Sequence, residues 1–265
     1  MDFDKKLRKV VKKNNSLVCV GLDSDFDRLP NRFKQLKHPQ FEFNKWIIDQ
    51  TYDLVCAYKP NFAFYEAKGE KGWKELRMTI EYVKDLHSGV QMIADAKRGD
   101  IGSTNKGYVK SLFDDLRFDA VTVHPYLGKE ALKPFLDMKD KGIMVLCRTS
   151  NSGAGEFQDL KVDGKPVWQM VAEKVRDDWN KYGNCMLVVG ATYPEELLKV
   201  RNLVGKMTLL VPGVGAQGAD VKKTVKAGLN SKNSGMIINS SRGIIFNKNP
   251  RLAVKELRDK INKCR

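Results

Sequence analysis

Short runs of apolar and β-branched residues recur along the chain, with segments of helical spacing between them. Nearly continuous apolar runs are typical of strands buried on both faces, as in a parallel sheet, whereas a half-exposed sheet shows alternation. The pattern predicts eight strands, at residues 16–22, 54–59, 90–96, 120–125, 142–147, 185–191, 208–212 and 235–241.

The intervening segments contain good helix-forming residues. Helices are predicted at residues 73–87, 103–116, 168–182 and 194–204, and Ser103 and Pro194 are suitable helix starts. Eight strands alternating with helices predict an α/β fold, a (β/α)8 TIM barrel, rather than an open doubly wound sheet. A chain of 265 residues with 42% hydrophobic content is long enough to form one domain, residues 1–265, around one core.

Residues 150–166 form the one long polar segment with several glycines. It would follow the fifth strand, at the end of the barrel where such folds place their chemistry. A loop of this length is more often functional or mobile than a simple connection. We therefore expect it near the functional site.

The chain is strongly basic, with 47 Lys and Arg against 32 Asp and Glu and a formal net charge of +15. This charge favours anionic partners such as phosphates, nucleic acid or acidic membrane surfaces. The basic residues are nevertheless scattered in short groups, such as Lys5-Lys6, Lys12-Lys13 and Lys222-Lys223. Scattered groups favour a solvated lysine-rich surface, so we expect no nucleic-acid partner.

Cysteine usage and the first residues of the chain favour the cytoplasm. Five cysteines, at 19, 56, 147, 185 and 264, include no Cys-x-x-Cys pair, and most lie in apolar runs where a thiol acts as a small core residue. The segment MDFDKKLRKVVKKNN contains no continuous apolar stretch that would serve as a signal peptide or span a bilayer. We expect neither secretion nor membrane insertion.

Polar side chains stand at the carboxyl ends of the predicted strands. In a barrel these ends converge on one mouth, so residues far apart in sequence become neighbours around a small-molecule site. The set comprises Asp23, Lys59, Asp95, Lys97, His124, Ser150, Gln217 and Arg242.

The densest group is IADAKRGDIGST, in which Asp95 and Lys97 share one face of an extended segment and Asp100 follows a glycine. Two carboxylates that flank an ammonium keep it charged, and a substrate carboxylate beside such an aspartate would be destabilised until it left as CO2. Lys97 could then deliver a proton. A surface ion pair is the alternative, but the apolar strand before the group and the helix start after it favour a partly buried mouth.

Two glycine-containing segments follow the seventh and eighth strands, where barrels usually bind phosphate: VPGVGAQG (211–218) and NSSRGI (239–244). Backbone N–H groups approach a phosphate closely at glycines, Gln217 can donate its amide, and Arg242 offers a planar fork to phosphate oxygens. A turn with a solvent-facing arginine is the alternative. The glycines do not match a dinucleotide-binding fingerprint.

Three further strand-end residues have alternative interpretations. Lys59 precedes Pro60 and an aromatic run, which suggests a fixed strand exit with Lys59 paired to Asp95, although a lone strand-end lysine is usually solvated. Asp23 would accept hydrogen bonds from sugar hydroxyls or cap a helix or loop. His124 is expected to be structural, because no Cys, His and carboxylate cluster has zinc-site spacing. Nothing requires a metal, and the lack of a Gly-x-Ser-x-Gly elbow disfavours a serine hydrolase.

In this order, the motifs resemble those of the orotidine 5'-monophosphate decarboxylase family, in its second bacterial-type subfamily. The matching segments are GLDSD, YKPNFAFYE, DAKRGDIGST, PGVGAQG and NSSRGI, within residues 16–246. The resemblance implies a (β/α)8 homodimer without metal or organic cofactor. It would convert orotidine 5'-monophosphate to uridine 5'-monophosphate and CO2, the last step of pyrimidine synthesis.

The resemblance also implies a division of the catalytic residues between two subunits. One subunit would supply Lys59, Asp95 and Lys97, and its partner would supply Asp100, Ile101 and Thr104. The two aspartates would oppose the departing carboxylate, and Lys97 would protonate the ring carbanion.

For substrate binding, the resemblance assigns Asp23 to the ribose and Ser150 to the pyrimidine. Gln217 and Arg242 would hold the phosphate, and the 212–218 loop, which begins at Pro212, would close over it. Closure would exclude water and let phosphate binding contribute to the reacting geometry.

Some alternatives stay open. Thr149 or Asn151 could replace Ser150 as the base contact, and Thr192 could face the mouth without an assigned role. A Mg²⁺-dependent sugar-phosphate lyase or synthase would use a similar barrel, but it would be expected to place a second acid near Lys59, and the nearest is Glu66. A basic nucleic-acid-binding protein is the alternative from another class.

Overall fold

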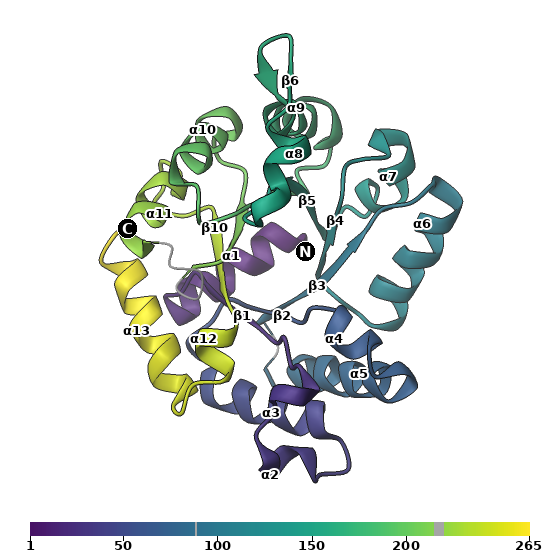
Figure 1. Cartoon of the computed structure of the whole chain (residues 1–265), viewed down its shortest axis with the longest axis vertical. Coiled ribbons are helices and arrows are strands. Elements are labelled where there is room, and N and C mark those ends of the chain that lie inside the picture. The colour runs from purple at the N-terminus through teal and green to yellow at the C-terminus, as the bar shows by residue number, and fades with distance from the viewer. Residues whose placement is uncertain (88, 215–219) are drawn as a thin grey trace.

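The computed structural model describes residues 1–87, 89–214 and 220–265. Eight parallel strands form a closed barrel in which neighbours in sequence are neighbours in space, and the last strand pairs with the first (Figure 1). The prediction of a (β/α)8 barrel is therefore confirmed. The barrel strands are β1 (Val18–Gly21), β2 (Ala57–Lys59), β3 (Gln91–Arg98), β4 (Ala120–Val123), β5 (Gly142–Arg148), β8 (Cys185–Val189), β9 (Leu209–Pro212) and β10 (Met236–Ser240).

Helices surround the barrel as an outer ring (Figure 1). The longer ones are α1 (Phe3–Asn14), α3 (Pro39–Thr51), α5 (Gly69–Leu86), α6 (Gly102–Val109), α7 (Gly128–Leu136), α9 (Val167–Lys174), α10 (Pro194–Val204), α11 (Val221–Gly228) and α13 (Pro250–Asn262). Single turns are α2 (Asn31–Lys34), α4 (Ala63–Glu66), α8 (Gly155–Gln158), α12 (Arg242–Ile245) and the 3₁₀ turns η1 (Phe26–Arg28) and η3 (Ser152–Ala154). Two π-helical segments, η2 (Lys110–Asp115) and η4 (Val175–Trp179), continue α6 and α9.

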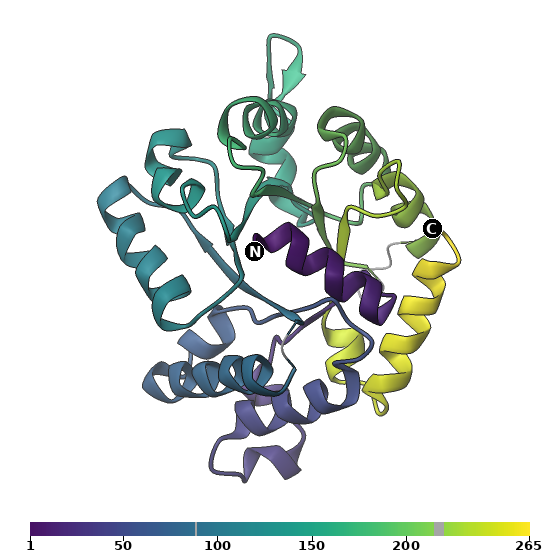
Figure 2. The ribbon, with the colours of Figure 1, turned by 180° about the vertical axis from the view of Figure 1, so that it is seen from behind.

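Helix α1 is outside the ring and crosses the amino-terminal end of the barrel (Figure 2). Asp2 caps it by accepting a hydrogen bond from the backbone N–H of Lys5 at 2.8 Å. One face buries Phe3, Leu7 and Val10. This helix was not predicted, although its buried residues recur at helical spacing after a capping aspartate.

The core consists of the strands and the inner faces of the ring helices. All residues of β1, β4, β8 and β10 are buried, as expected for strands covered on both faces. Complete burial of a large apolar side chain such as Phe43 or Phe135 contributes about 1.5–3 kcal/mol. The continuous apolar runs in the sequence therefore follow from the barrel itself.

The predicted element boundaries need several corrections. β2 begins at Ala57 rather than at residue 54, and Leu54, Val55 and Cys56, which precede it, are buried. β3 continues to Arg98 instead of ending at residue 96. The helices predicted at 103–116 and 168–182 change to π-helical hydrogen bonding at their carboxyl ends. The helix predicted at 194–204 agrees with α10.

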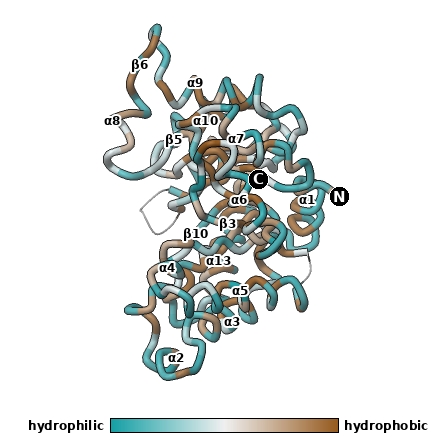
Figure 3. The backbone as a smooth tube through the Cα atoms, turned by 90° about the vertical axis from the view of Figure 1, so that its right-hand side faces the viewer, coloured by the Kyte–Doolittle hydropathy of each residue, from teal (hydrophilic) through white to brown (hydrophobic). Residues whose placement is uncertain are grey.

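The polar segment 150–166 is more structured than the sequence suggested. It contains η3, α8 and a hairpin of β6 (Lys161–Val162) and β7 (Lys165–Pro166). Arg148 holds it to β5 through an ion pair of 3.0 Å with Asp159. The segment follows β5, and α8 and β6 lie on the side of the barrel away from α1 (Figure 3).

Four of the five cysteines are buried free thiols, and Cys264 is partly exposed. Burial raises the pKa of the Cys56, Cys147 and Cys185 thiols to about 12, so they stay protonated at neutral pH. They act as small core residues, as predicted. None of the helices in the described ranges combines the length and apolarity needed to cross a membrane.

Candidate active site

The mouth of the barrel contains a buried ion pair between adjacent strands. Lys59 is the last residue of β2, and its Nζ lies 2.5 Å from Oδ2 of Asp95 on β3. Lys59 is 3% exposed and Asp95 is 9% exposed. A backbone hydrogen bond of 3.1 Å from the Asp95 N–H to the carbonyl of Pro60 fixes the two strand ends against each other. Lys59 thus points inward, and the structure brings the two residues together as the sequence analysis expected.

Lys97 completes a charged triad with Lys59 and Asp95. Its Nζ lies 2.5 Å from Oδ1 of Asp95, and its side chain is 49% exposed. Burial alone would raise the pKa of the Asp95 carboxyl, but the ammoniums of Lys59 and Lys97 outweigh it and hold that pKa well below its ordinary value of 3.8. The carboxylate therefore stays charged at neutral pH.

The same triad stabilises the charge of Lys59. Burial alone would lower the pKa of its ammonium, but the carboxylates of Asp95 and Asp23 raise it above the ordinary value of 10.5. A charged lysine and a charged aspartate therefore coexist in a largely dry site. Such a pair tolerates little change, because removal of one partner leaves the other charge buried and unpaired.

We expect Asp95→Asn to lower the free energy of unfolding at pH 7 by about 3 kcal/mol, since it leaves Lys59 without its counter-charge. The folded-state pKa of Asp95 is depressed, so its contribution is present above pH 3.8 and is lost as the pH falls toward the folded-state value. The stability difference between wild type and variant should therefore narrow below that pH. Denaturant unfolding from pH 7 to pH 3 measures it, and a difference independent of pH would contradict the assignment.

Regular strand alternation does not account for the pairing of Asp95 with Lys97, which corrects the sequence interpretation. The register between β3 and β4 shifts between Ala94 and Arg98. Within this irregularity, Lys97 has a positive φ of 45°, in the left-handed region that non-glycine residues rarely adopt. The two side chains meet because the backbone is bent at this point.

A cavity of about 160 Å³ opens beside the triad at the carboxyl ends of the strands. Its lining comprises Asp23, Lys59, Asp95, Pro212, Gly213, Val214, Asn239, Ser240, Ser241 and Arg242. Five of these residues were predicted from the sequence, and they come from the ends of strands far apart in the chain. Gln217, the other predicted phosphate contact, lies outside the described residues.

Two buried oxygens in this cavity have no hydrogen-bond partner among the described residues: Oδ1 of Asp23 and Oδ1 of Asn239. Buried acceptors of this kind are costly unless a ligand or water supplies a donor. A ligand hydroxyl would supply a donor to Asp23, and the expected contact of Asp23 with a sugar stays a prediction. Asn239 was not predicted as a contact, although it is the first residue of the predicted phosphate-binding segment 239–244.

Asp100, Ile101 and Thr104 are separate from the triad within this chain. The Asp100 carboxylate accepts a hydrogen bond of 2.6 Å from the Ile101 N–H. Among the interactions of the described residues, none joins Asp100 to Lys59, Asp95 or Lys97. Ile101 is 58% exposed, and Thr104 is also exposed. Their predicted role in the site of a second subunit stays a prediction.

The residues after β5 lie close to the neighbouring strand end. A Cβ atom at Gly190 would lie 2.6 Å from Cβ of Ser150, so only glycine allows this contact. The Thr149 N–H donates a hydrogen bond of 2.8 Å to Oε1 of Gln158. Ser150 does not line the cavity beside the triad. The choice among Thr149, Ser150 and Asn151 as base contact therefore stays open.

Thr122 on β4 is a contact of the triad that sequence reasoning missed. Its Oγ1 lies 3.1 Å from Oδ1 of Asp95 and accepts a hydrogen bond of 3.0 Å from the Lys97 N–H. The residue is 1% exposed. A polar residue inside the apolar run AVTVHP was the available signal.

Two other polar residues near the mouth have structural roles. The His124 ring packs against Gly99, where an added Cβ would lie 2.6 Å from Nε2, in agreement with the predicted structural role. Glu66 forms an ion pair of 2.5 Å with Arg98. Within residues 1–87, 89–214 and 220–265, no three His, Cys, Asp or Glu side chains gather closely enough to hold a metal ion.

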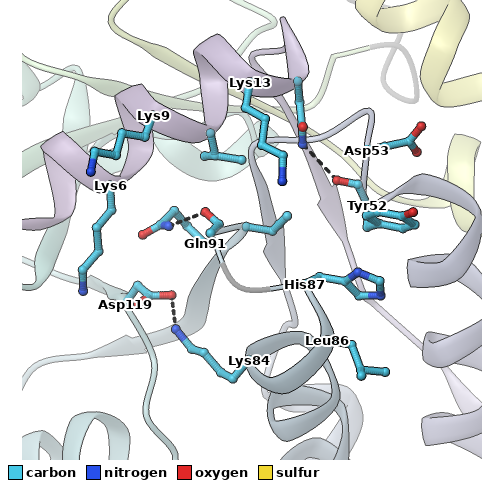
Figure 4. A pocket seen from close by; sticks show the side chains of 14 residues that line it. Lys6, Lys9, Lys13, Tyr52, Asp53, Lys84, Leu86, His87, Gln91 and Asp119 are labelled. Atoms are coloured by element: carbon cyan, nitrogen blue, oxygen red, sulfur yellow. Dashed lines mark hydrogen bonds and ion pairs between the residues drawn. The ribbon is translucent and has the colours of Figure 1, made fainter.

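A larger cavity of about 590 Å³ lies at the opposite end of the barrel (Figure 4). Lys6, Lys9 and Lys13 of α1 face it, and Gln91 at the start of β3 lines its floor. Its Asp119 is engaged by an ion pair with Lys84 and by the Met92 N–H. Of the predicted site residues that the structure describes, none lines this cavity, so its greater volume does not make it the reactive site.

Known proteins are similar to this chain over nearly its whole length. The model of the orotidine 5'-phosphate decarboxylase / HUMPS family matches residues 16–257. The chain is 48% identical over 274 residues to an orotidine 5'-phosphate decarboxylase from Cellvibrio japonicus (strain Ueda107), covering 100% of both proteins.

Solved structures are similar over the whole chain. The structure of Leishmania donovani OMP decarboxylase has a TM-score of 0.89 and 40% identity, covering 100% of this chain and 99% of that one. The structure of Leishmania donovani UMP synthase has a TM-score of 0.91 and 41% identity, covering 100% of this chain but 56% of that one.

Proposed function

Because the chain belongs to the orotidine 5'-phosphate decarboxylase / HUMPS family, we propose that it converts orotidine 5'-monophosphate to uridine 5'-monophosphate and CO2, with Lys59, Asp95 and Lys97 as its central catalytic residues. As a carboxy-lyase of this family, it acts in pyrimidine biosynthesis. The observation that supports the assignment of residues best is the buried Asp95 carboxylate, which two ammoniums contact at 2.5 Å each.

The proposed chemistry follows from the charges at the mouth. The substrate carboxylate is placed beside Asp95, where like charges repel in a site of low polarity. The bond from the ring carbon C6 to the carboxylate breaks, CO2 departs, and the electron pair stays on C6. Lys97 Nζ donates a proton to C6, and water later returns a proton to Lys97. Neutral CO2 relieves the repulsion, whereas the ammonium of Lys97 stabilises the developing carbanion.

Lys59 has a separate part in this proposal. It lies 2.5 Å from Oδ2 of Asp95, on the oxygen opposite the one that contacts Lys97. It therefore keeps Asp95 ionised and oriented without entering proton transfer. Lys97 has a left-handed backbone and a half-exposed side chain, so its ammonium is open to a ligand while it contacts Asp95.

We further propose that Asp23 binds the ribose hydroxyls and that Arg242, with Pro212 at the edge of the same cavity, binds the phosphate. The unpartnered Oδ1 of Asp23 is an acceptor for a hydroxyl. Arg242 is exposed at the start of α12 and has a planar fork suited to phosphate oxygens. Gln217 is the second proposed phosphate contact and Ser150 the proposed pyrimidine contact.

We expect Arg242→Ala to weaken binding of uridine 5'-monophosphate by about 10- to 100-fold, because a bidentate charged contact is lost. Uridine, which lacks the phosphate, should bind wild type and variant equally. Calorimetric titration with both ligands measures the difference. Equal weakening for uridine would show that Arg242 acts on folding or on the nucleoside rather than on the phosphate.

The proposed active form is a homodimer in which each mouth is completed by Asp100, Ile101 and Thr104 of the other subunit. Support comes from their placement within one chain. They follow β3 directly, Ile101 and Thr104 are exposed, and Asp100 does not contact the triad of its own chain. An aspartate from the partner would lie on the open side of Lys97.

The proposed reaction is tested by the ultraviolet absorbance of orotidine 5'-monophosphate mixed with the protein in excess chelator. Loss of substrate absorbance with formation of the uridine nucleotide is the expected result. No change in chelator, followed by turnover of a sugar phosphate once Mg²⁺ is added, would instead favour the metal-dependent lyase of the same barrel type.

A further inference from the structure

The Lys97 backbone lies in a part of β3 whose pairing with β4 is irregular. Ala94 pairs with Val121 and Arg98 with Val123, so four steps along β3 face two steps along β4. On the β4 side the residues between them have no ladder partners, although Asp95 forms an isolated bridge with Asn61 on the β2 side. Lys97 has a φ of 45°. In this conformation the Cβ atom crowds the backbone, so another interaction has to maintain it.

The side chain of Thr122 lies opposite this irregularity and contacts both of its charged residues. Its Oγ1 accepts a hydrogen bond of 3.0 Å from the Lys97 N–H. The same oxygen lies 3.1 Å from Oδ1 of Asp95 and 3.4 Å from the carbonyl of Ala94. Thr122 is 1% exposed, so water does not compete for these contacts.

A hydroxyl has one hydrogen, so Thr122 can donate only one of these hydrogen bonds. Thr122 accepts from the Lys97 N–H and donates to the Asp95 carboxylate, which is closer than the Ala94 carbonyl and charged. The oxygen that receives this hydrogen bond also contacts Lys97 Nζ. One hydroxyl therefore ties the backbone of Lys97 to the carboxylate that orients its ammonium.

We infer that Thr122 is a positioning residue for proton transfer by Lys97. This inference rests on the proposed function and extends it to a residue that does not line the cavity beside the triad. Without the hydroxyl, the Lys97 N–H loses its acceptor and the carboxylate loses a donor. The ammonium then samples positions away from C6, although the charges at the mouth are unchanged.

The matched variants are Thr122→Val, which keeps the shape and removes the hydroxyl, and Thr122→Ser, which keeps the hydroxyl. We expect Thr122→Val to lower kcat about 10- to 100-fold with little change in KM. Thr122→Ser should stay within about threefold of wild type. Thr79→Val is the control, because Thr79 is buried and its hydroxyl also takes part in two hydrogen bonds. It accepts one from Asn44 of α3 and donates one to the Glu75 carbonyl within α5.

A second measurement isolates proton transfer. By microscopic reversibility, the group that protonates C6 also removes that proton, so the uridine 5'-monophosphate C6 hydrogen should exchange with deuterium from D2O on the enzyme. Thr122→Val should slow this exchange by a factor similar to that for kcat, while its affinity for uridine 5'-monophosphate stays unchanged. Thr79→Val should affect thermal stability without slowing exchange.

The outcomes separate the two ideas. Wild type that fails to decarboxylate orotidine 5'-monophosphate would overturn the proposed function itself. Active wild type with a folded, equally active Thr122→Val, or equal losses in Thr122→Val and Thr122→Ser, would overturn only the role of Thr122. If Thr122→Val does not fold, Thr122→Ala and Thr122→Ser are compared by the same exchange rate, and the role fails if both exchange alike.

Discussion

Lys97→Ala is expected to lower kcat by at least about 10³-fold while leaving a folded protein. Loss of a general acid alone costs about 10²- to 10⁴-fold, and this substitution also removes the positive charge that stabilises the carbanion. Folding should survive, because the Lys97 side chain is half exposed and Asp95 keeps its buried contact with Lys59. Substrate absorbance in chelator measures activity, and thermal melting measures folding.

Lys199→Ala is the matched control for this experiment. Lys199 is exposed on α10, so the variant loses the same charge without touching the mouth. It should keep wild-type activity. If Lys97→Ala is as active as Lys199→Ala, Lys97 has no part in the chemistry. If Lys97→Ala is inactive and Lys199→Ala is active, the result supports Lys97 as the proton donor.

Mixing inactive Lys97→Ala and Asp100→Ala subunits is expected to restore activity. If each site takes Lys97 from one subunit and Asp100 from the other, a mixed dimer has one site with both substitutions and one intact site. Random pairing gives half mixed dimers, and hence about one quarter of wild-type activity. Mixed dimers purified through two different tags should reach about one half.

The activity of the purified mixed dimer also tests the alternative, in which Lys97 and Asp100 of the same chain act together. In that case each site of the mixed dimer would lack one of the two residues, and mixing would restore no activity. A mixed dimer of Lys97→Ala with Lys59→Ala serves as the control, because both residues lie on the same chain beside Asp95. That combination should stay inactive.

The barrel was predictable because each of its strands has a recognisable sequence pattern. Strands covered on both faces require apolar residues at nearly every position, and these runs stand out in sequences such as CMLVV of β8. The polar strand ends were predictable for a related reason. Lys59 and Asp95 break apolar runs at the end where a barrel opens, and the structure joins them at 2.5 Å.

The missed features depend on contacts between elements. Thr122 resembles any strand threonine until β4 is placed beside the irregular part of β3. The left-handed conformation of Lys97 has no sequence signal, since lysine has no preference for it. Helix α1 is different, because a local signal for it was present and was overlooked: Phe3, Leu7 and Val10 recur at helical spacing.

The pairing of β1 with β10 has a consequence for the synthesis of this chain. Val18 pairs with Ile238, and Ser241 donates a hydrogen bond to the carbonyl of Gly21, 220 residues earlier. A ribosome releases β1 long before it has made β10. The backbone N–H and C=O groups of β1 that pair with β10 therefore lack their partners during most of translation. An unpaired strand edge is a template for association with other chains. Nascent chains of this protein are thus most exposed to aggregation late in elongation, when several strands are made and the sheet is still open.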